Sequence, residues 1–119
     1  MNKLKVLFVD DEHSLLKTYS LLLESDTSII ETCASEFEAI ERLKLGSFDI
    51  CFLDYRMPEL NGIQIREKVG DLGTKFYLIT GELDFEDVPG FESVLMKPNF
   101  ISEVESIIEN YAKQKLLDT

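Results

Sequence analysis

Short apolar runs alternate along this chain with segments in which apolar residues recur every three or four positions. The runs have the length and composition of buried β-strands: LKVLFV (4–9), IIETCA (29–34), DICFL (49–53), KFYLI (75–79) and SVLM (93–96). Alternation of such strands with helical segments is typical of βαβ units, in which helices cover both faces of a parallel sheet. The pattern therefore predicts an α/β fold with a parallel sheet.

Two of the intervening segments show a clear apolar stripe at helical spacing. The first predicted helix covers about 13–25, and its stripe comprises Leu15, Leu16, Tyr19, Leu22 and Leu23. The last predicted helix follows the strand at 93–96, and its stripe comprises Val104, Ile107, Ile108, Tyr111 and Ala112. We expect both helices to bury these stripes against the sheet.

Capping residues predict where two helices begin. Ser35 with Glu38 has the spacing of a capping box and opens a helix that ends near Gly46. Ser102 with Glu105 has the same spacing and predicts the start of the last helix. These signals place one helix between the second and third strands and another after the fifth.

Glycine and proline shorten the two remaining helices. The helix after Gly62 is short, because glycines at 70 and 73 interrupt it. Sixteen residues separate Thr80 from Lys97. The fifth strand takes about four or five of them, which leaves little for a crossover that needs about 10–12 with its helix. Pro89 and Gly90 fall inside it, so we expect this fourth helix to be shortened or absent.

Composition narrows the classes of function. The length of 119 residues and the 45% apolar content suit one domain over residues 1–119. The net charge of −11, with no basic and aromatic stretch, argues against direct nucleic-acid binding. The first apolar run is too short for a signal sequence or a membrane span, so we expect a cytoplasmic protein without a membrane partner. Cys33 and Cys51 form no CxxC pattern and are expected to be buried, reduced thiols.

Charged and hydroxyl side chains follow four of the predicted strands. Asp10 and Asp11 follow the first strand, Asp54 the third, Thr80 the fourth and Lys97 the fifth. Ligands of open α/β sheets bind at the carboxyl ends of the strands, so these side chains are expected to meet. Three carboxylates in one place repel unless a cation neutralises them, and oxygen ligands favour Mg²⁺. A carboxylate beside Mg²⁺ is a candidate nucleophile towards phosphorus.

Four motifs in this order resemble the receiver domain of two-component response regulators: VLFVDDE, LDYRMPELNG, LIT and LMKP. The resemblance covers essentially the whole chain. It implies a flavodoxin-like, doubly wound fold whose five parallel strands have the order 2-1-3-4-5. It also implies that Asp54 accepts a phosphoryl group from the phosphohistidine of a histidine kinase or a histidine phosphotransfer protein, and that an effector protein or a fused output domain reads the result. Such a domain is a signalling module that catalyses only its own phosphorylation and dephosphorylation.

The resemblance also assigns roles to individual residues. Asp10, Asp11, Asp54 and the main-chain carbonyl of Arg56 would hold Mg²⁺. Lys97 would pair with the phosphoryl oxygens, and Thr80 would hydrogen-bond to one of them. The Lys97–Pro98 bond is expected to be cis, and Gly62 is expected to supply a turn conformation that few other residues tolerate.

Two features concern the readout and the lifetime of the phosphorylated state. Receivers usually carry an aromatic switch residue three positions before the lysine, where this chain has Val94. Together with the short crossover between the fourth and fifth strands, this predicts that the phosphorylated state is passed to its effector in a different way from most receivers. Arg56 and Glu82 would flank the phosphoryl group, and we hypothesise that they form an ion pair that slows attack by water.

Three other functions fit parts of the pattern. A haloacid-dehalogenase-type phosphohydrolase also uses an aspartyl nucleophile and Mg²⁺, but it typically has a second aspartate where this chain has Arg56. An FMN protein would need a hydroxyl-rich phosphate loop where this chain has Asp10 and Asp11. A pseudo-receiver that only binds partners would not need the complete set of acidic residues with Thr80 and Lys97, although Val94 leaves this alternative open.

Overall fold

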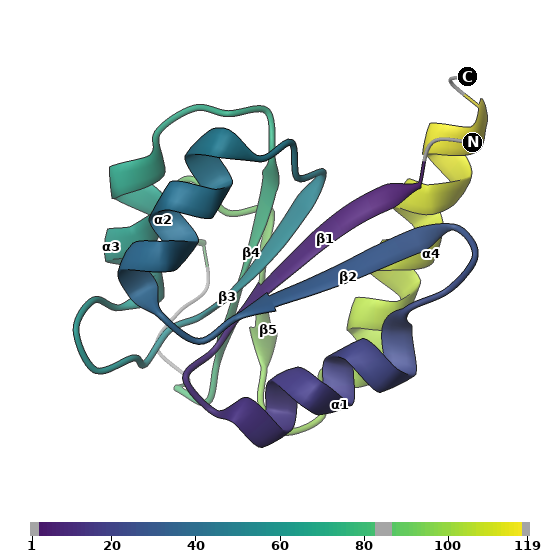
Figure 1. The fold of residues 1–119 in the computed structure, drawn as a ribbon. Helices are drawn as coiled ribbons and strands as arrows, with labels where there is room; N and C mark the ends of the chain where they lie inside the picture. Colours follow the sequence, from purple (N-terminus) through teal and green to yellow (C-terminus); the bar gives the residue numbers. More distant parts are fainter. Residues whose placement is uncertain (1–2, 83–86, 118–119) are drawn as a thin grey trace.

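A five-stranded parallel sheet forms the centre of the molecule (Figure 1). The structure is a computed structural model, and it describes residues 3–82 and 87–117. The strands have the order β2-β1-β3-β4-β5. Their bounds are β1 Leu4–Val9, β2 Ser28–Cys33, β3 Ile50–Asp54, β4 Lys75–Thr80 and β5 Ser93–Met96. The predicted α/β class and strand order are confirmed, and the predicted bounds differ by at most one residue at either end.

Helices cover both faces of this sheet, as a doubly wound fold requires (Figure 1). The helices are α1 His13–Leu23, α2 Glu36–Leu45, α3 Gly62–Val69 and α4 Ile101–Leu117. The pair α2 and α3 lies on one face, and the pair α1 and α4 lies on the other. Because all five strands run in parallel, their carboxyl ends meet at one edge of the sheet.

Stacked aromatic rings fill the core between the sheet and the α1–α4 layer. The ring of Tyr19 from α1 lies on Phe8, Phe8 lies on Phe52, and Phe52 lies on Tyr77, with centroids 4.4, 4.8 and 5.3 Å apart. The stack crosses β1, β3 and β4 directly behind the edge where those strands end. Such contacts add about 0.5–1.5 kcal/mol each beyond burial, so they stabilise the strands that carry the site.

The opposite face of the sheet packs against α2 and α3. Leu7, Leu43 and Leu53 are buried there, together with Cys33 and Cys51. Both cysteines are buried and free, which confirms the expectation of reduced thiols. In the part of the chain that the structure describes, no helix is long and apolar enough to cross a membrane.

The connection between β4 and β5 carries no helix in its described residues, 81–82 and 87–92. This agrees with the prediction of a shortened or absent fourth helix; the remaining residues of the connection lie outside the described part. The helix labelled α4 therefore follows β5. In this connection the ring of Phe91 packs on Phe76 edge to face, with centroids 6.4 Å apart.

Two local predictions are wrong, and a third is confirmed in part. Leu22 is 61% exposed, because Leu16, Tyr19 and Leu23 form the centre of the α1 stripe and Leu22 lies at its margin. Ser102 is not a cap: α4 begins at Ile101, and the carbonyl of the buried Phe100 already accepts a hydrogen bond from Val104 N at 3.0 Å. At α2 one half of the predicted capping box forms, since Ser35 Oγ accepts from Glu38 N.

Candidate functional site

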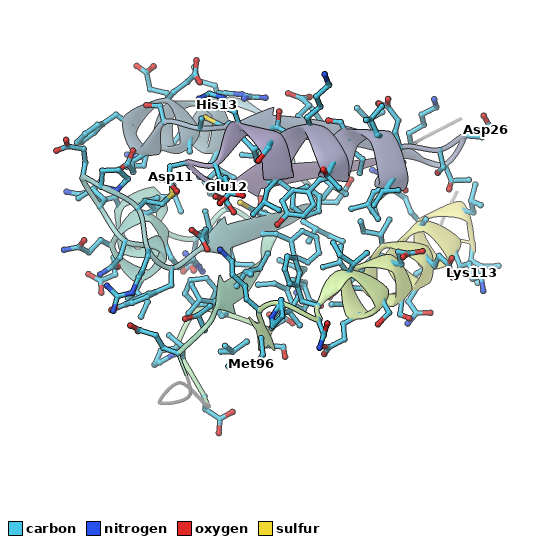
Figure 2. The ribbon with its side chains drawn as sticks, turned by 90° about the horizontal axis from the view of Figure 1, so that it is seen from below. Asp11, Glu12, His13, Asp26, Met96 and Lys113 are labelled. Carbon is cyan, nitrogen blue, oxygen red and sulfur yellow. The ribbon has the colours of Figure 1, made fainter. Side chains whose placement is uncertain are left out.

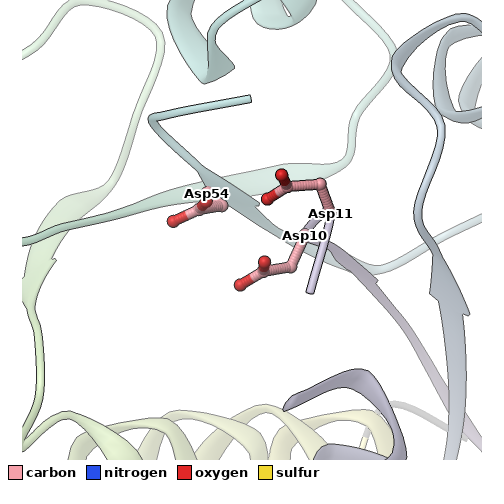
Figure 3. Close-up of side chains that lie close together, drawn as sticks. All are labelled: Asp10, Asp11 and Asp54. Atoms are coloured by element: carbon pink, nitrogen blue, oxygen red, sulfur yellow. The ribbon is translucent and has the colours of Figure 1, made fainter. Parts of the chain in front are cut away.

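Three carboxylates lie together at the carboxyl edge of the sheet (Figure 3). Asp10 and Asp11 follow β1, and Asp54 is the last residue of β3, the neighbouring strand. One oxygen from each side chain lies within 4.8 Å of the others. Asp10 and Asp54 are only 3% and 4% exposed, whereas Asp11 is exposed. The structure thus brings together the three acids that the sequence singled out.

Lys97 completes the cluster from the other side. It follows β5 directly, and its main-chain N donates to Thr80 O at 2.9 Å. Its Nζ lies 2.8 Å from Asp54 Oδ1 and 3.8 Å from Asp10 Oδ2. The Lys97–Pro98 bond is cis, as expected. One ammonium group is therefore shared between two of the three acids.

Burial controls the charge of these groups. It raises the pKa of Asp10 from 3.8 to about 6, and the nearby Asp54 and Asp11 add to this, against the Glu12 N–H and Lys97, which favour the ionised form. Burial also raises the pKa of Asp54, although Lys97 opposes the effect. Burial alone would lower the pKa of Lys97, but Asp54 and Asp10 outweigh it and raise this pKa. The cluster holds more negative charge than its protein surroundings stabilise.

One oxygen of Asp10 has an unsatisfied capacity to accept a hydrogen bond or a cation. Its Oδ1 accepts a hydrogen bond from Glu12 N at 2.9 Å. Its Oδ2 is buried and has no hydrogen-bond partner among the described residues. A buried acceptor without a partner costs about 1–3 kcal/mol. Three carboxylates with an unused oxygen are the donor set that a hard divalent cation such as Mg²⁺ prefers.

Thr80 and Glu82 line a shallow hollow over Asp54, together with Arg56, Gly81 and Lys97. Thr80 is the last residue of β4, is buried, and accepts a hydrogen bond from Glu82 N at Oγ1 at 3.0 Å. The hydroxyl proton of Thr80 is not used in that bond. Across the hollow, the Arg56 guanidinium donates to Glu82 Oε1 in an ion pair. The predicted pairing of Arg56 with Glu82 is confirmed.

The loop between β3 and α3 comes closer to Asp54 than the sequence indicated. Gly62 has no positive φ, so the expected special turn conformation is wrong. A Cβ at Gly62 would instead lie 2.7 Å from Asp54 O and 2.8 Å from Leu78 Cδ1. Glycine is needed because the first turn of α3 packs directly against the acceptor strand.

Two contacts of this loop were missed. Asn61 and Gln64 form a complete capping box at the start of α3, a signal readable in the sequence. Glu36, 5% exposed at the start of α2, accepts hydrogen bonds from Glu59 N and Leu60 N. Nothing in the sequence pairs residue 36 with residues 59 and 60.

Two further residues, His13 and Val94, take no part in the acidic cluster. His13 is exposed as the first residue of α1, and Figure 2 shows it beside Asp11 and Glu12 at the carboxyl edge. Val94 is half-buried on β5. Neither has a polar side-chain contact with the acids.

Comparison with known proteins identifies the family. The family model described as "Response regulator receiver domain" matches residues 6–109. Two curated relatives are the hybrid signal transduction histidine kinase L of Dictyostelium discoideum, 28% identical over 92% of this chain, and a putative transcriptional regulator of Haloferax volcanii, 30% identical over 87%. The chain covers only 7% and 18% of the length of these two proteins.

Solved structures agree in fold. A CheY-like receiver domain from Methanospirillum hungatei superposes with a TM-score of 0.81 at 20% identity, covering 99% of this chain and 100% of that one. A receiver domain from Clostridium thermocellum superposes with a TM-score of 0.80 at 26% identity, covering 98% and 99%. With the family match over most of its length, this chain belongs to the response regulator receiver domain family of two-component signalling proteins.

Proposed function

We propose that residues 1–119 form one receiver domain that accepts a phosphoryl group on Asp54 from the phosphohistidine of a histidine kinase or a histidine phosphotransfer protein. One observation carries the proposal: Lys97 Nζ lies 2.8 Å from the buried Asp54 carboxylate, beside Asp10 and Asp11. This arrangement suits a carboxylate that receives a phosphoryl group, since fixed cationic groups stabilise the charge on the transferring oxygens.

The transfer exchanges one phosphorus bond for another. A carboxylate oxygen of Asp54 attacks phosphorus, and the P–N bond of the phosphohistidine breaks. The imidazole nitrogen keeps the electron pair of that bond and takes a proton from solvent. The product is an aspartyl phosphate. The hollow lined by Thr80, Gly81 and Lys97 lies over Asp54, which is itself only 4% exposed, so the donor reaches Asp54 through this hollow.

Asp10, Asp11, Asp54 and the Arg56 carbonyl would hold Mg²⁺, which neutralises phosphoryl oxygens when bound. Lys97 then exchanges its contact with the Asp54 carboxylate for a phosphoryl oxygen. Thr80 donates its unused hydroxyl proton to another phosphoryl oxygen. Both residues already face the hollow, so neither needs a large movement.

The partners follow from this chemistry. The donor is a phosphorylated histidine on a kinase or a phosphotransfer protein, and one relative is itself named a hybrid histidine kinase. The output is an effector protein or an output domain. We place the chain in the cytoplasm and assign it no nucleic-acid or membrane contact of its own, which fits the net charge of −11.

Incubation with acetyl phosphate and Mg²⁺ tests the function. We expect a mass increase of one phosphoryl group that is stable in acid, labile in base, and absent in Asp54→Asn. Asp26→Asn, at the opposite end of the molecule (Figure 2), is the matched control and should be labelled normally. Continuous phosphate release without an adduct would indicate a phosphohydrolase, and no response to acetyl phosphate or beryllofluoride would indicate a pseudo-receiver.

A further inference from the structure

A buried glutamate joins α2 to the loop that follows the acceptor strand. Glu36 is the first residue of α2 and is 5% exposed. Its Oε2 accepts hydrogen bonds from Glu59 N at 2.5 Å and from Leu60 N at 3.3 Å. Both donors are main-chain groups of the loop between Asp54 and Gly62. One side chain thus links the start of α2 to the loop that leads into α3.

The surroundings of Glu36 explain how its charge is tolerated. A buried carboxylate is costly unless hydrogen bonds satisfy it. Among the described residues Glu36 forms no ion pair; it accepts two main-chain N–H groups instead. It also lies in the first turn of α2, where the helix dipole favours negative charge. The buried Glu36 carboxylate is therefore stabilised only while the loop keeps Glu59 N and Leu60 N within hydrogen-bond distance.

Among the described residues, the other main-chain hydrogen bonds of the loop lie near its ends. At its start Tyr55 N donates to Ile79 O at 2.9 Å, and at its end Gly62 N donates to Tyr55 O at 3.0 Å. The middle of the loop is held by Glu36 and by the packing of Met57 and Leu60 against the core. Pro58 has no N–H to contribute. The hydrogen bonds of Glu36 thus fix the segment that follows Arg56.

We propose that Glu36 is a positioning residue for the metal and phosphoryl site: it holds the main chain at Glu59 and Leu60 and thereby keeps the Arg56 carbonyl in place beside Asp54. This inference rests on the proposed function. Glu36 touches neither the acids nor the hollow over Asp54, so it acts only through the loop. Loss of the tether leaves all three carboxylates intact but lets their fourth ligand move.

Three variants and a control separate this role from simple stabilisation. Glu36→Ala removes the tether. Glu36→Asp keeps the charge but shortens the reach by one methylene group. Glu36→Gln keeps the reach and an acceptor oxygen without the charge. Glu41→Ala, an exposed residue of the same helix, is the matched control for loss of a glutamate.

Two measurements on the folded proteins test the proposal. Amide hydrogen exchange of Glu59 and Leu60, without metal, should accelerate at least about tenfold in Glu36→Ala and Glu36→Asp, and stay slow in Glu36→Gln and Glu41→Ala. The Kd for Mg²⁺, measured by titration calorimetry, should rise about tenfold in the first two variants, which is typical when an outer-shell partner is lost. If Glu36→Ala does not fold, the Asp and Gln pair carries the test.

The outcomes separate a failure of the positioning role of Glu36 from a failure of the proposed function. Wild-type Mg²⁺ affinity in folded Glu36→Ala or Glu36→Asp would overturn the positioning role, even if their thermal stability falls. A Kd for Glu36→Gln as weak as that of Glu36→Asp would overturn it too, because charge rather than reach would then matter. If the wild-type protein neither binds Mg²⁺ nor forms an adduct on Asp54, the proposed function itself fails, and the inference fails with it.

Discussion

Two segments leave neighbouring strands at the same edge of the sheet, yet the protein holds them by different means. The loop between β3 and α3 is fixed by main-chain hydrogen bonds, the Asn61–Gln64 capping box and the buried Glu36. The described residues of the connection between β4 and β5 form two main-chain hydrogen bonds near its end, Phe91 N to Val88 O and Glu92 N to Phe76 O. Two arginine side chains from the β3–α3 loop and α3 hold it as well. Arg56 pairs with Glu82 at one end, and Arg66 donates to Gly90 O at 2.8 Å at the other.

The more firmly held segment is the β3–α3 loop, which lies next to the acceptor Asp54. Groups held by buried contacts keep their positions when charge arrives at Asp54, as a phosphoryl acceptor requires. An exposed ion pair such as Arg56 with Glu82 is worth only about 0–1 kcal/mol, so it holds its segment less firmly than the buried contacts of Glu36 hold the β3–α3 loop. In the family resemblance an aromatic residue reports the change, but here that position is the half-buried Val94. That output is read differently in this chain therefore stays a prediction.

Two glycines give the sharpest contrast between the segments. Gly62→Ala should destabilise the protein by about 3 kcal/mol, because the new Cβ meets the main chain of Asp54 and overpacking costs of that order are usual. Gly81→Ala should change stability by less than about 0.5 kcal/mol, since the nearest atom to its new Cβ is Lys97 Cβ at 4.0 Å. Urea unfolding measures both. Equal losses of unfolding free energy in the two variants would contradict the difference between the two segments.

The pH dependence of stability tests whether the ionised Asp10 carboxylate destabilises the folded protein when no metal is bound. Burial raises the pKa of Asp10 to about 6 in the folded chain, against an ordinary value of 3.8. The contribution of Asp10 to stability is thus present below the lower value and is lost as the pH rises through the higher one. In the absence of metal, Asp10→Asn should therefore stabilise the protein by about 2–3 kcal/mol at neutral pH.

This gain should shrink towards zero as the pH falls below about 4, because Asp10 is then protonated in both states of the wild type. Urea unfolding in EDTA at neutral and acid pH provides the measurement. Mg²⁺ should stabilise the wild type more than the Asn variant. A variant less stable than the wild type at neutral pH would show that the carboxylate is already satisfied.

Arg66 anchors the far end of the β4–β5 connection. Besides Gly90 O, it donates to Gly70 O at 2.7 Å and lies over the Phe76 ring at 4.4 Å. Arg66→Ala should cost about 1–2 kcal/mol of unfolding free energy. It should also increase amide exchange at Phe91, which packs on Phe76. Lys68→Ala, on the exposed side of α3, is the control. An unchanged exchange rate at Phe91 would mean that Arg66 is not the anchor.

Arg56 should have the smallest effect on stability and a specific effect on lifetime. Arg56→Ala should change the unfolding free energy by less than about 1 kcal/mol. Since the ion pair covers the hollow over Asp54, its loss should admit water and shorten the half-life of the aspartyl phosphate by up to about fivefold. Acid-quenched mass spectrometry follows the decay. An unchanged half-life would sink the idea.

The sequence predicted the parts of this molecule that depend on local pattern. Apolar runs located the strands, and the residues that follow them located Asp10, Asp11 and Lys97. The strand order came from the family resemblance. Asp54 and Thr80 turned out to be the last residues of their strands, a shift of one position that leaves their side chains at the same edge.

Other features depend on contacts between distant residues, and these were missed or misread. Glu36 and Glu59 are 23 positions apart, and only the packing of α2 beside the loop makes them partners. Gly62 was taken for a turn residue, although its role is close approach to Asp54. By contrast, the Asn61–Gln64 capping box was local and readable.

The central claim is that Asp54 receives a phosphoryl group from nitrogen with Lys97 beside it. Phosphoramidate, a small donor with the same P–N bond as phosphohistidine, tests this most directly when the intact mass is followed over time with Mg²⁺. The account predicts one phosphoryl group on the wild type, none on Asp54→Asn, and a rate about 100-fold or more slower in Lys97→Ala, the usual cost of removing one charge-stabilising donor. Wild-type labelling of Asp54→Asn, or an undiminished rate in Lys97→Ala, would contradict it.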